Sequence, residues 1–499
     1  MNLDAQVDNH ASVPAGGQTS RDEGERRLKY LPWLVMILVA IAFSRTPWFD
    51  FVNWDDGLHV FANPAVVGPG EARDRWLTPS LGYAIPVTVA SYRLEYLLVG
   101  ASPWLYHATN LLLHLGVCGL LYGLGRRLGL GRLGASCAML FFGLHPVVAE
   151  PVSWVSGRKD LLAAVLGLAA TWGFLAASAR PERRARAMLG AVALFALAAF
   201  SKPSVLALPL AWLWLASGRM RVRCLLAVPA MAVALAITML SWLGQSRVGA
   251  VHASPSPLVW AREVYYALGY HLGLAFMVQQ PLAKHIPAVM PPWFDPAVDL
   301  FPFGVGLLAW LWLGRMESRS RQVARFGLLF AGMAYLPSSG IAPLTRYLAD
   351  SYVYLPLAGL AWAVGASAET VLPRVRAAWR WTGGIAAVLA LLLASSAASL
   401  SWHDGISLWQ TVYQRYPDSP QVCLNLGNAH FELGGFQAAL DIYERCSSRF
   451  GPDHFAKNHA ISLFMVGRTQ EARQLFQHLR ARYPGDPVVH KYLRFLGVE

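Results

Sequence analysis

Charged residues are scarce in this chain. Only 14% of its 499 residues are Asp, Glu, Lys or Arg, whereas 55% are hydrophobic. A soluble protein usually carries about a quarter charged residues. The deficit is concentrated between Leu31 and Leu400, in apolar blocks separated by short basic segments. The composition therefore excludes one large soluble domain and predicts an all-α, polytopic helical membrane protein.

Cysteine is scarce as well, and the sequence lacks most short catalytic motifs. None of the five cysteines has CxxC spacing, and there is no HExxH, GxSxG or P-loop. Three cysteines lie in apolar blocks and are interpreted as small core residues. Cys423 and Cys446 lie in the polar C-terminal part, where the sequence leaves a disulfide bond between them open.

A glycine-rich segment at residues 129–134 matches GxGxxG, the fingerprint of many dinucleotide sites. It lies in a short turn between two apolar blocks, and no predicted strand precedes it. We therefore reject a dinucleotide-binding site.

The net charge of +13 comes largely from arginines clustered at the ends of apolar blocks. This placement follows the positive-inside rule for membrane proteins and argues against a nucleic-acid-binding face. Residues 1–28 are polar and end in basic residues, so we interpret them as a disordered cytoplasmic leader. The N-terminus is then inside, and the first apolar block is an uncleaved helix.

The apolar blocks predict about 11 transmembrane helices, with the C-terminus outside. Residues 82–100 are predicted to form an interfacial helix. Residues 262–300 are predicted to form a re-entrant or interfacial helix followed by an outer loop. The eleven predicted spans are residues 31–43, 104–124, 135–148, 161–177, 188–200, 205–216, 225–243, 303–313, 326–336, 352–366 and 381–400.

The domain organisation follows from the change in composition after residue 400. Residues 29–400 are the predicted transmembrane domain, and residues 44–103 are its first outer loop. In the polar remainder, residues 432–439 recur loosely as residues 465–472. This offset of 33 is close to the 34-residue tetratricopeptide period. Residues 401–499 are therefore predicted to form a tetratricopeptide-repeat α-solenoid on the outer face.

An acidic pair, Asp55 and Asp56, follows directly after the first apolar block. A carboxylate is costly in hydrocarbon, so a pair at a membrane boundary should line water or a site. From the residues alone, a site and a solvated turn near Gly57 are equally good interpretations. Adjacent carboxylates also raise each other's pKa, which suits a general base.

The other predicted outer segments contain a group of polar residues of both signs. Cations at a membrane surface suit the phosphate of a lipid-linked donor. The simpler interpretations are histidines that pack between helices, side chains that shape a helix end and surface charge pairs. The residues are Glu95, His107, His145, Glu150, Arg158, Lys159, Lys202, His285, Arg346 and Asp350.

Several motifs, in order, resemble the bacterial relatives of the transmembrane and tetratricopeptide-repeat O-mannosyltransferases, which are similar to GT-C glycosyltransferases. Each motif is weak alone, and the specificity lies in their conjunction. The sequence departs from the family pattern at Ser351, a position where family members commonly have arginine. The motifs are residues 53–56, 63–64, 107–114, 144–160, 201–203 and 349–356.

The resemblance implies an inverting glycosyltransferase of the bacterial inner membrane that uses a polyprenyl-phosphate sugar on its periplasmic face. It makes Asp55 the expected general base, and Asp56 would orient it or hold the acceptor. Arg158, Lys159, Lys202 and Arg346 become candidates for binding the donor phosphate. The expected acceptor is a hydroxyl, most simply of a protein Ser or Thr, and the repeats would bind that protein or a partner.

A divalent metal at the acidic pair is not favoured, so no cofactor is expected. The alternative function is a non-catalytic, membrane-anchored repeat scaffold for an envelope complex, and Ser351 is the feature that favours it.

Overall fold

The computed structural model describes residues 28–68, 84–179, 184–215, 220–247, 256–286, 296–341 and 348–498. All regular secondary structure in these ranges is helical, as the sequence predicts. The predicted leader, apart from its last residue, lies outside the described residues.

The chain divides into two compact units. The first unit contains residues 1–49 and 58–399, and the second contains residues 50–57 and 400–499. The short segment 50–57, which carries the acidic pair, thus groups with the C-terminal helices. The sequence assigned it to the first loop of the membrane domain, because nothing in the local pattern reveals a partner more than 300 residues away.

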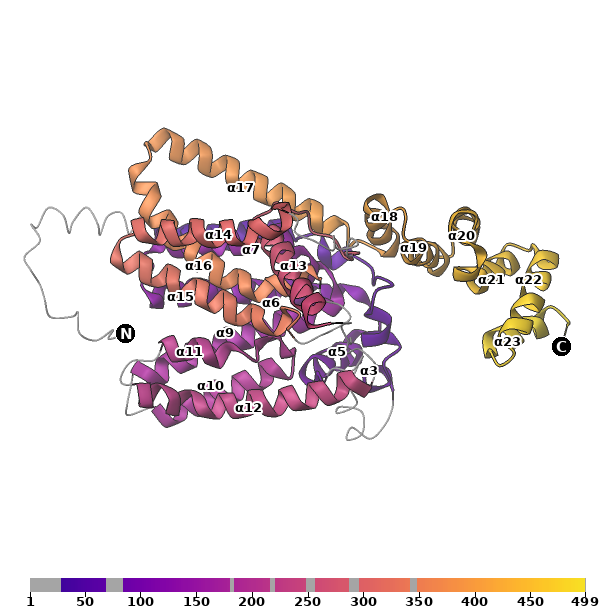
Figure 1. The fold of residues 1–499 in the computed structure, drawn as a ribbon, viewed down its shortest axis with the longest axis horizontal. Coiled ribbons are helices and arrows are strands. Elements are labelled where there is room, and N and C mark those ends of the chain that lie inside the picture. The colour runs from indigo at the N-terminus through magenta and orange to yellow at the C-terminus, as the bar shows by residue number, and fades with distance from the viewer. Residues whose placement is uncertain are drawn as a thin grey trace, which may run out of the picture. The chain divides into compact units, whose positions relative to one another are not determined.

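The first unit, which we call the membrane unit, is built from helices α2 to α17 (Figure 1). Short 3-10 or π-helical turns lie between several of them, including η3 (Gly57–Phe61), η7 (Pro203–Val205), η8 (Leu336–Ser338) and η9 (Asp350–Val353). The α-helices are α2 (Leu31–Ala42), α3 (Pro64–Val67), α5 (Pro86–Val99), α6 (Pro103–Leu128), α7 (Arg132–Gly143), α8 (Ala149–Ser153), α9 (Arg158–Ala179), α10 (Arg184–Ala199), α11 (Leu208–Leu215), α12 (Met220–Arg247), α13 (Pro257–Ala275), α14 (Pro296–Arg315), α15 (Ser318–Tyr335), α16 (Tyr354–Val371) and α17 (Ala377–Leu400).

Each of the eleven predicted spans overlaps one of these helices, and several are long and apolar enough to cross a membrane, so this is a multi-pass membrane protein. A pair formed by α7 and Pro146–Ser153 is apolar enough to cross together but is bent by 53°. The count of eleven crossings stays a prediction, since α10 and α15 carry arginines in their first turns. Six segments among the described residues are long and apolar enough to cross alone, namely Leu28–Trp48, Pro103–Leu128, Val155–Ser178, Leu226–Arg247, Asp350–Arg374 and Ala377–Leu400.

Helix α16 packs between α7 and α15 in the membrane unit. Small residues permit this arrangement: a Cβ atom on Gly359 would collide with the backbone of Gly327, and one on Gly365 with the backbone of Gly134. Close backbone approach through small residues is the usual way that helices associate in a membrane. The indole of Trp362 fills the space beside this contact and donates a hydrogen bond to the Leu121 carbonyl at 3.0 Å.

The second unit, which we call the repeat unit, is a series of packed helices with its own core. Successive helices pair in chain order, as a tetratricopeptide array would, although the repeat type itself stays a prediction. Cys423 and Cys446 form a disulfide bond between the second and third helices, which resolves the alternative left open by the sequence. The helices are α18 (Gly405–Arg415), α19 (Pro420–Glu432), α20 (Phe436–Phe450), α21 (Ala456–Met465), α22 (Thr469–Arg482) and α23 (Pro487–Phe495).

Candidate functional site

Lys202 forms an ion pair with Asp160 in the membrane unit. The Lys202 Nζ atom lies 2.5 Å from Asp160 Oδ1, and 5.3 Å from the centre of the Tyr352 ring. Lys202 stands in an extended turn before η7, and Asp160 belongs to the first turn of α9. Both side chains are largely buried, since 13% of Lys202 and 4% of Asp160 is exposed. Two groups that the sequence placed in separate outer segments thus meet.

A cavity of about 420 Å³ opens beside Lys202. Its walls are mostly apolar, with Lys202 as the charged side chain among the lining residues. This combination suits a ligand with an anionic head and a hydrocarbon chain. The lining residues are Lys202, Pro203, Ser204, Leu206, Ala207, Leu210, Thr238, Ser241, Trp242, Gln245, Leu336, Pro337, Ser338, Ile341 and Tyr352.

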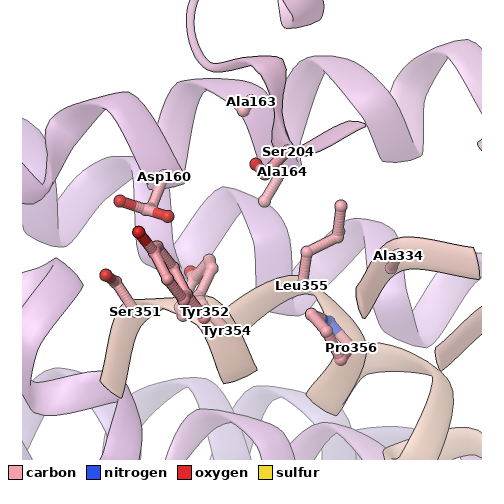
Figure 2. A pocket seen from close by; sticks show the side chains of 10 residues that line it. All are labelled: Asp160, Ala163, Ala164, Ser204, Ala334, Ser351, Tyr352, Tyr354, Leu355 and Pro356. Atoms are coloured by element: carbon pink, nitrogen blue, oxygen red, sulfur yellow. The ribbon is translucent and has the colours of Figure 1, made fainter. Parts of the chain in front are cut away.

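Ser351 and Asp160 line a common small cavity. Figure 2 shows Asp160 of α9 opposite Ser351, Tyr352 and Tyr354, around a second and very small cavity. Its volume of about 10 Å³ is at the lower limit for one water molecule. The position where the family resemblance predicts an arginine is therefore closely packed around serine. Arg346, one of the residues predicted to bind the donor phosphate, lies outside the described residues.

Arg158 does not reach this cavity. It is fully buried, and its three guanidinium nitrogens donate to three acceptors in the membrane unit: Glu95 Oε2 at 2.5 Å, the Tyr106 carbonyl at 2.6 Å and Asn110 Oδ1 at 2.9 Å. The guanidinium also lies 4.9 Å from the centre of the Tyr92 ring. The structure thus gives Arg158 and Glu95 a place in the framework. Their roles in phosphate and substrate binding stay predictions.

We expect Arg158→Met to lower the free energy of unfolding by roughly 3–5 kcal/mol, because it leaves Glu95 buried without its cation. Thermal unfolding of the protein in detergent measures this loss. The double variant Arg158→Met, Glu95→Leu should recover most of it. Arg374→Met, at an exposed ion pair 3.7 Å from Glu317, is the matched control and should cost less than about 1 kcal/mol. Equal losses at both arginines would contradict the framework role.

Lys159 is not among the residues that line the large cavity. Its Nζ lies 4.5 Å from the centre of the Trp154 ring. Burial, and to a lesser extent the charge of Lys159, lower the pKa of His59 to about 3. His59, in η3 outside the spanning helices, is therefore a neutral imidazole at physiological pH.

His285 and Asp350 form a second polar pair. Nε2 of His285 lies 2.8 Å from Asp350 Oδ1, and Asp350 Oδ2 accepts a hydrogen bond from the Leu282 amide at 2.7 Å. Asp350 begins η9, which also carries Tyr352. The pair therefore fixes the turn that forms one wall of the large cavity.

The remaining predicted site residues are buried between helices. His145 caps η4 (Pro146–Val148), where its Nδ1 accepts from the Val147 amide, and its Nε2 lies 3.2 Å from the Ala275 carbonyl. His107 packs edge-on against Phe49, and Glu150 is 1% exposed in the first turn of α8. Within the described ranges no three His, Cys, Asp or Glu side chains converge as metal ligands.

The two carboxylates of the acidic pair have different environments. Asp56 is fully buried, and its Oδ2 accepts a hydrogen bond from the Val52 amide at 3.0 Å, which closes the segment into a loop. Asp55 is only half-buried and has a positive φ of 65°. This left-handed conformation is uncommon outside glycine, although Asp tolerates it better than most residues. We call residues 50–57 the acidic loop.

Three residues with clear structural roles here carry no assigned role in the sequence analysis. Asp160 pairs with Lys202, Asn110 binds Arg158, and Asn53 holds the acidic loop to the repeat unit. Asp160 and Asn53 lie inside motifs that resemble the family, which is a usable signal. Their partners lie far away in the sequence, and no local pattern identifies them.

Comparison with known proteins gives partial matches to one group of enzymes. No family model matches the chain. It is 35% identical over 127 residues to protein O-mannosyl-transferase Tmtc1 of Drosophila melanogaster, which covers 23% of this chain and 15% of that protein. It is 30% identical over 169 residues to human protein O-mannosyl-transferase TMTC4, which covers 28% of this chain and 23% of that protein.

Part of the chain is similar to the protein O-mannosyl-transferases. The resemblance stated from the sequence is thereby confirmed for the group. A third relative, tmtc2 of Xenopus laevis, is 41% identical over 80 residues, covering 15% of this chain. The matches span only 9 to 23% of the length of these three relatives.

Among solved structures, ArnT from Cupriavidus metallidurans bound to undecaprenyl phosphate aligns over 89% of this chain and 80% of its own, with a TM-score of 0.41 and 18% identity. The structure of the same protein in the apo state gives a TM-score of 0.40.

Proposed function

We propose that this relative of the O-mannosyl-transferases is a membrane glycosyltransferase. It transfers a sugar from a polyprenyl-phosphate donor to a hydroxyl acceptor, most simply a protein Ser or Thr. The observation that carries the proposal is the cavity of about 420 Å³ with apolar walls and the Lys202 ammonium at its edge. The names of the relatives support the reaction class.

The donor phosphate is the group that Lys202 is suited to bind. Its ammonium is fixed by Asp160 and Tyr352, so little reorganisation is needed when charge develops on the leaving phosphate. The apolar walls, from Leu206, Leu210 and Trp242, suit the first isoprene units of the lipid. The His285–Asp350 pair keeps Tyr352 in place by fixing η9.

The acceptor is activated by Asp55 in this proposal. The carboxylate takes the proton of the acceptor hydroxyl while that oxygen forms a bond to the anomeric carbon of the sugar. The bond from that carbon to the phosphate oxygen breaks, and polyprenyl phosphate leaves with the electron pair. The configuration is inverted, and no covalent enzyme intermediate forms. Asp56 is held by the Val52 amide and acts by holding the loop.

The repeat unit faces the outside of a bacterial inner membrane in this proposal. Its disulfide bond between Cys423 and Cys446 supports this, because structural disulfides persist in oxidising compartments and are rare in the cytosol. The arginine clusters, which favour the cytoplasmic side, lie at the ends of the apolar blocks opposite to the predicted outer segments.

The test is transfer of labelled sugar from a polyprenyl-phosphate donor in membrane vesicles to a membrane-impermeant Ser/Thr peptide. We expect transfer in right-side-out vesicles that contain the protein and none in inside-out vesicles or in vesicles without it. Transfer in inside-out vesicles alone would overturn the proposal that the site faces the outside of the membrane. Absence of transfer in both, with several donor sugars and acceptors, would favour the scaffold function suggested by Ser351.

A further inference from the structure

The acidic loop is attached to the first two helices of the repeat unit by side-chain hydrogen bonds. Asn53 Oδ1 accepts from the Trp409 indole nitrogen of α18 at 2.9 Å, and Asn53 Nδ2 donates to the Asn425 carbonyl of α19 at 3.3 Å. The Asp50 amide donates to the His403 carbonyl at 2.9 Å. One short segment is thus held at three points by residues about 350 to 370 positions later.

Packing strengthens this attachment. The rings of Trp54 and Trp409 meet edge to face, with centroids 5.2 Å apart. Trp409 is completely buried. Gly405 leaves room for the loop: a Cβ atom at that position would stand only 2.7 Å from Asn53 Oδ1. A side chain at the start of α18 would therefore require the Asn53 amide to shift from its hydrogen-bonded position.

The attached residues bracket the proposed base. Asn53 and Trp54 immediately precede Asp55, and Asp56 follows it with its carboxylate bound to the Val52 amide. The neighbours of Asp55 are thus fixed to α18, α19 or the loop itself. Among the described residues no hydrogen bond or ion pair involves the Asp55 carboxylate, so its direction is set by the backbone around it.

We propose that the repeat unit positions the Asp55 carboxylate, with Asn53 and Trp409 as positioning residues. This rests on the proposed function, in which Asp55 is the general base. The repeats then have a role in the chemical step itself, in addition to any binding of an acceptor protein. Displacing the loop from α18 should slow proton abstraction and leave donor binding unchanged.

The experiment uses the full-length protein in detergent and two displacing variants. Asn53→Ala removes the two hydrogen bonds that the Asn53 side chain makes to α18 and α19. Gly405→Ala favours the helix, because alanine is the better helix former, but its Cβ pushes Asn53 away. The control is Gly485→Ala, where an added Cβ meets no atom within 4 Å. Gly405→Ala therefore separates loop displacement from unfolding of the repeats.

The first readout is hydrogen exchange of the amides in residues 50–57. In both displacing variants their exchange should become about tenfold faster, since hydrogen bonds that hold the loop are lost. The amides of α20 to α22 should exchange as in the wild type and in Gly485→Ala. Unchanged exchange of residues 50–57 in both displacing variants would overturn the proposal.

The second readout is the kinetics of transfer. We expect kcat to fall about tenfold or more while KM for the donor stays within about twofold, because the loop acts in the chemical step. Faster exchange with an unchanged kcat would also overturn positioning. If the wild type transfers no sugar, the proposed function fails and positioning of a base fails with it. The exchange data would still decide whether the repeats hold the loop.

Discussion

Replacing Asp55 with asparagine should reduce the rate of sugar transfer by roughly 10²- to 10⁴-fold, the usual contribution of a general base. The amide keeps the size and most of the hydrogen-bonding geometry of the carboxylate but cannot accept the acceptor's proton. Because Asp55 is half-buried and makes no hydrogen bond or ion pair among the described residues, the substitution should leave the stability of the protein nearly unchanged. Initial rates with saturating donor and acceptor measure the effect.

Asp50→Asn is the matched control for this variant. It removes the same charge from the same loop, at an exposed residue whose backbone amide donates a hydrogen bond to the His403 carbonyl. Its transfer rate should stay within about threefold of the wild type. Comparable losses at both positions would indicate a general effect of loop charge, and undiminished transfer by Asp55→Asn would remove Asp55 as the base.

Replacing Lys202 with methionine should lower kcat by roughly 10²- to 10³-fold, the loss seen when a fixed charge-stabilising group is removed from a transition state. The ammonium lies at the edge of the large cavity, where it can balance the charge of the leaving phosphate. Lys202→Arg keeps the charge and should retain much of the activity. Steady-state transfer kinetics distinguish these outcomes.

The partner of Lys202 complicates this variant and also provides its control. Lys202→Met leaves Asp160 buried without a cation, so part of the loss would reflect destabilisation. The double variant Lys202→Met, Asp160→Leu should recover the stability without recovering transfer. Lys159→Met removes the next lysine along the chain, which lies against Trp154, and should transfer nearly as well as the wild type. Full activity of the double variant would exclude Lys202 as the phosphate ligand.

The helices of the membrane unit could be predicted from the sequence because their signals are local. An apolar block bounded by arginines specifies a helix whatever its neighbours are, and each of the eleven predicted spans overlaps one. The repeat helices are equally local, with an offset of 33 between similar segments. The number of helices that cross the membrane is harder to predict from local sequence. Helix α15, for example, has 18 residues, which is long enough to cross, but it carries arginines in its first turn.

The candidate site could be predicted only as a set of residue types. Arg158 and Lys202 look alike in the sequence, as cations in predicted outer segments. Arg158 is buried against Glu95, 63 residues earlier. Lys202 pairs with Asp160, 42 residues earlier, and borders the large cavity. Burial separates a framework arginine from a lysine that can bind a ligand, and burial depends on tertiary packing that no short motif encodes.

The attachment of the acidic loop also has a consequence for biosynthesis. Asn53 and Trp409 are 356 residues apart. At a synthesis rate of about 5–20 residues per second, roughly 20 to 70 s separate the appearance of the loop from that of the helix that holds it. During this interval a nascent chain carries Lys202 and its cavity without the partners of Asn53. If Lys202 binds the donor and the repeats position Asp55, a chain that ends before α18 binds donor lipid but does not consume it, so transfer begins only after α18 and α19 have been synthesised and folded.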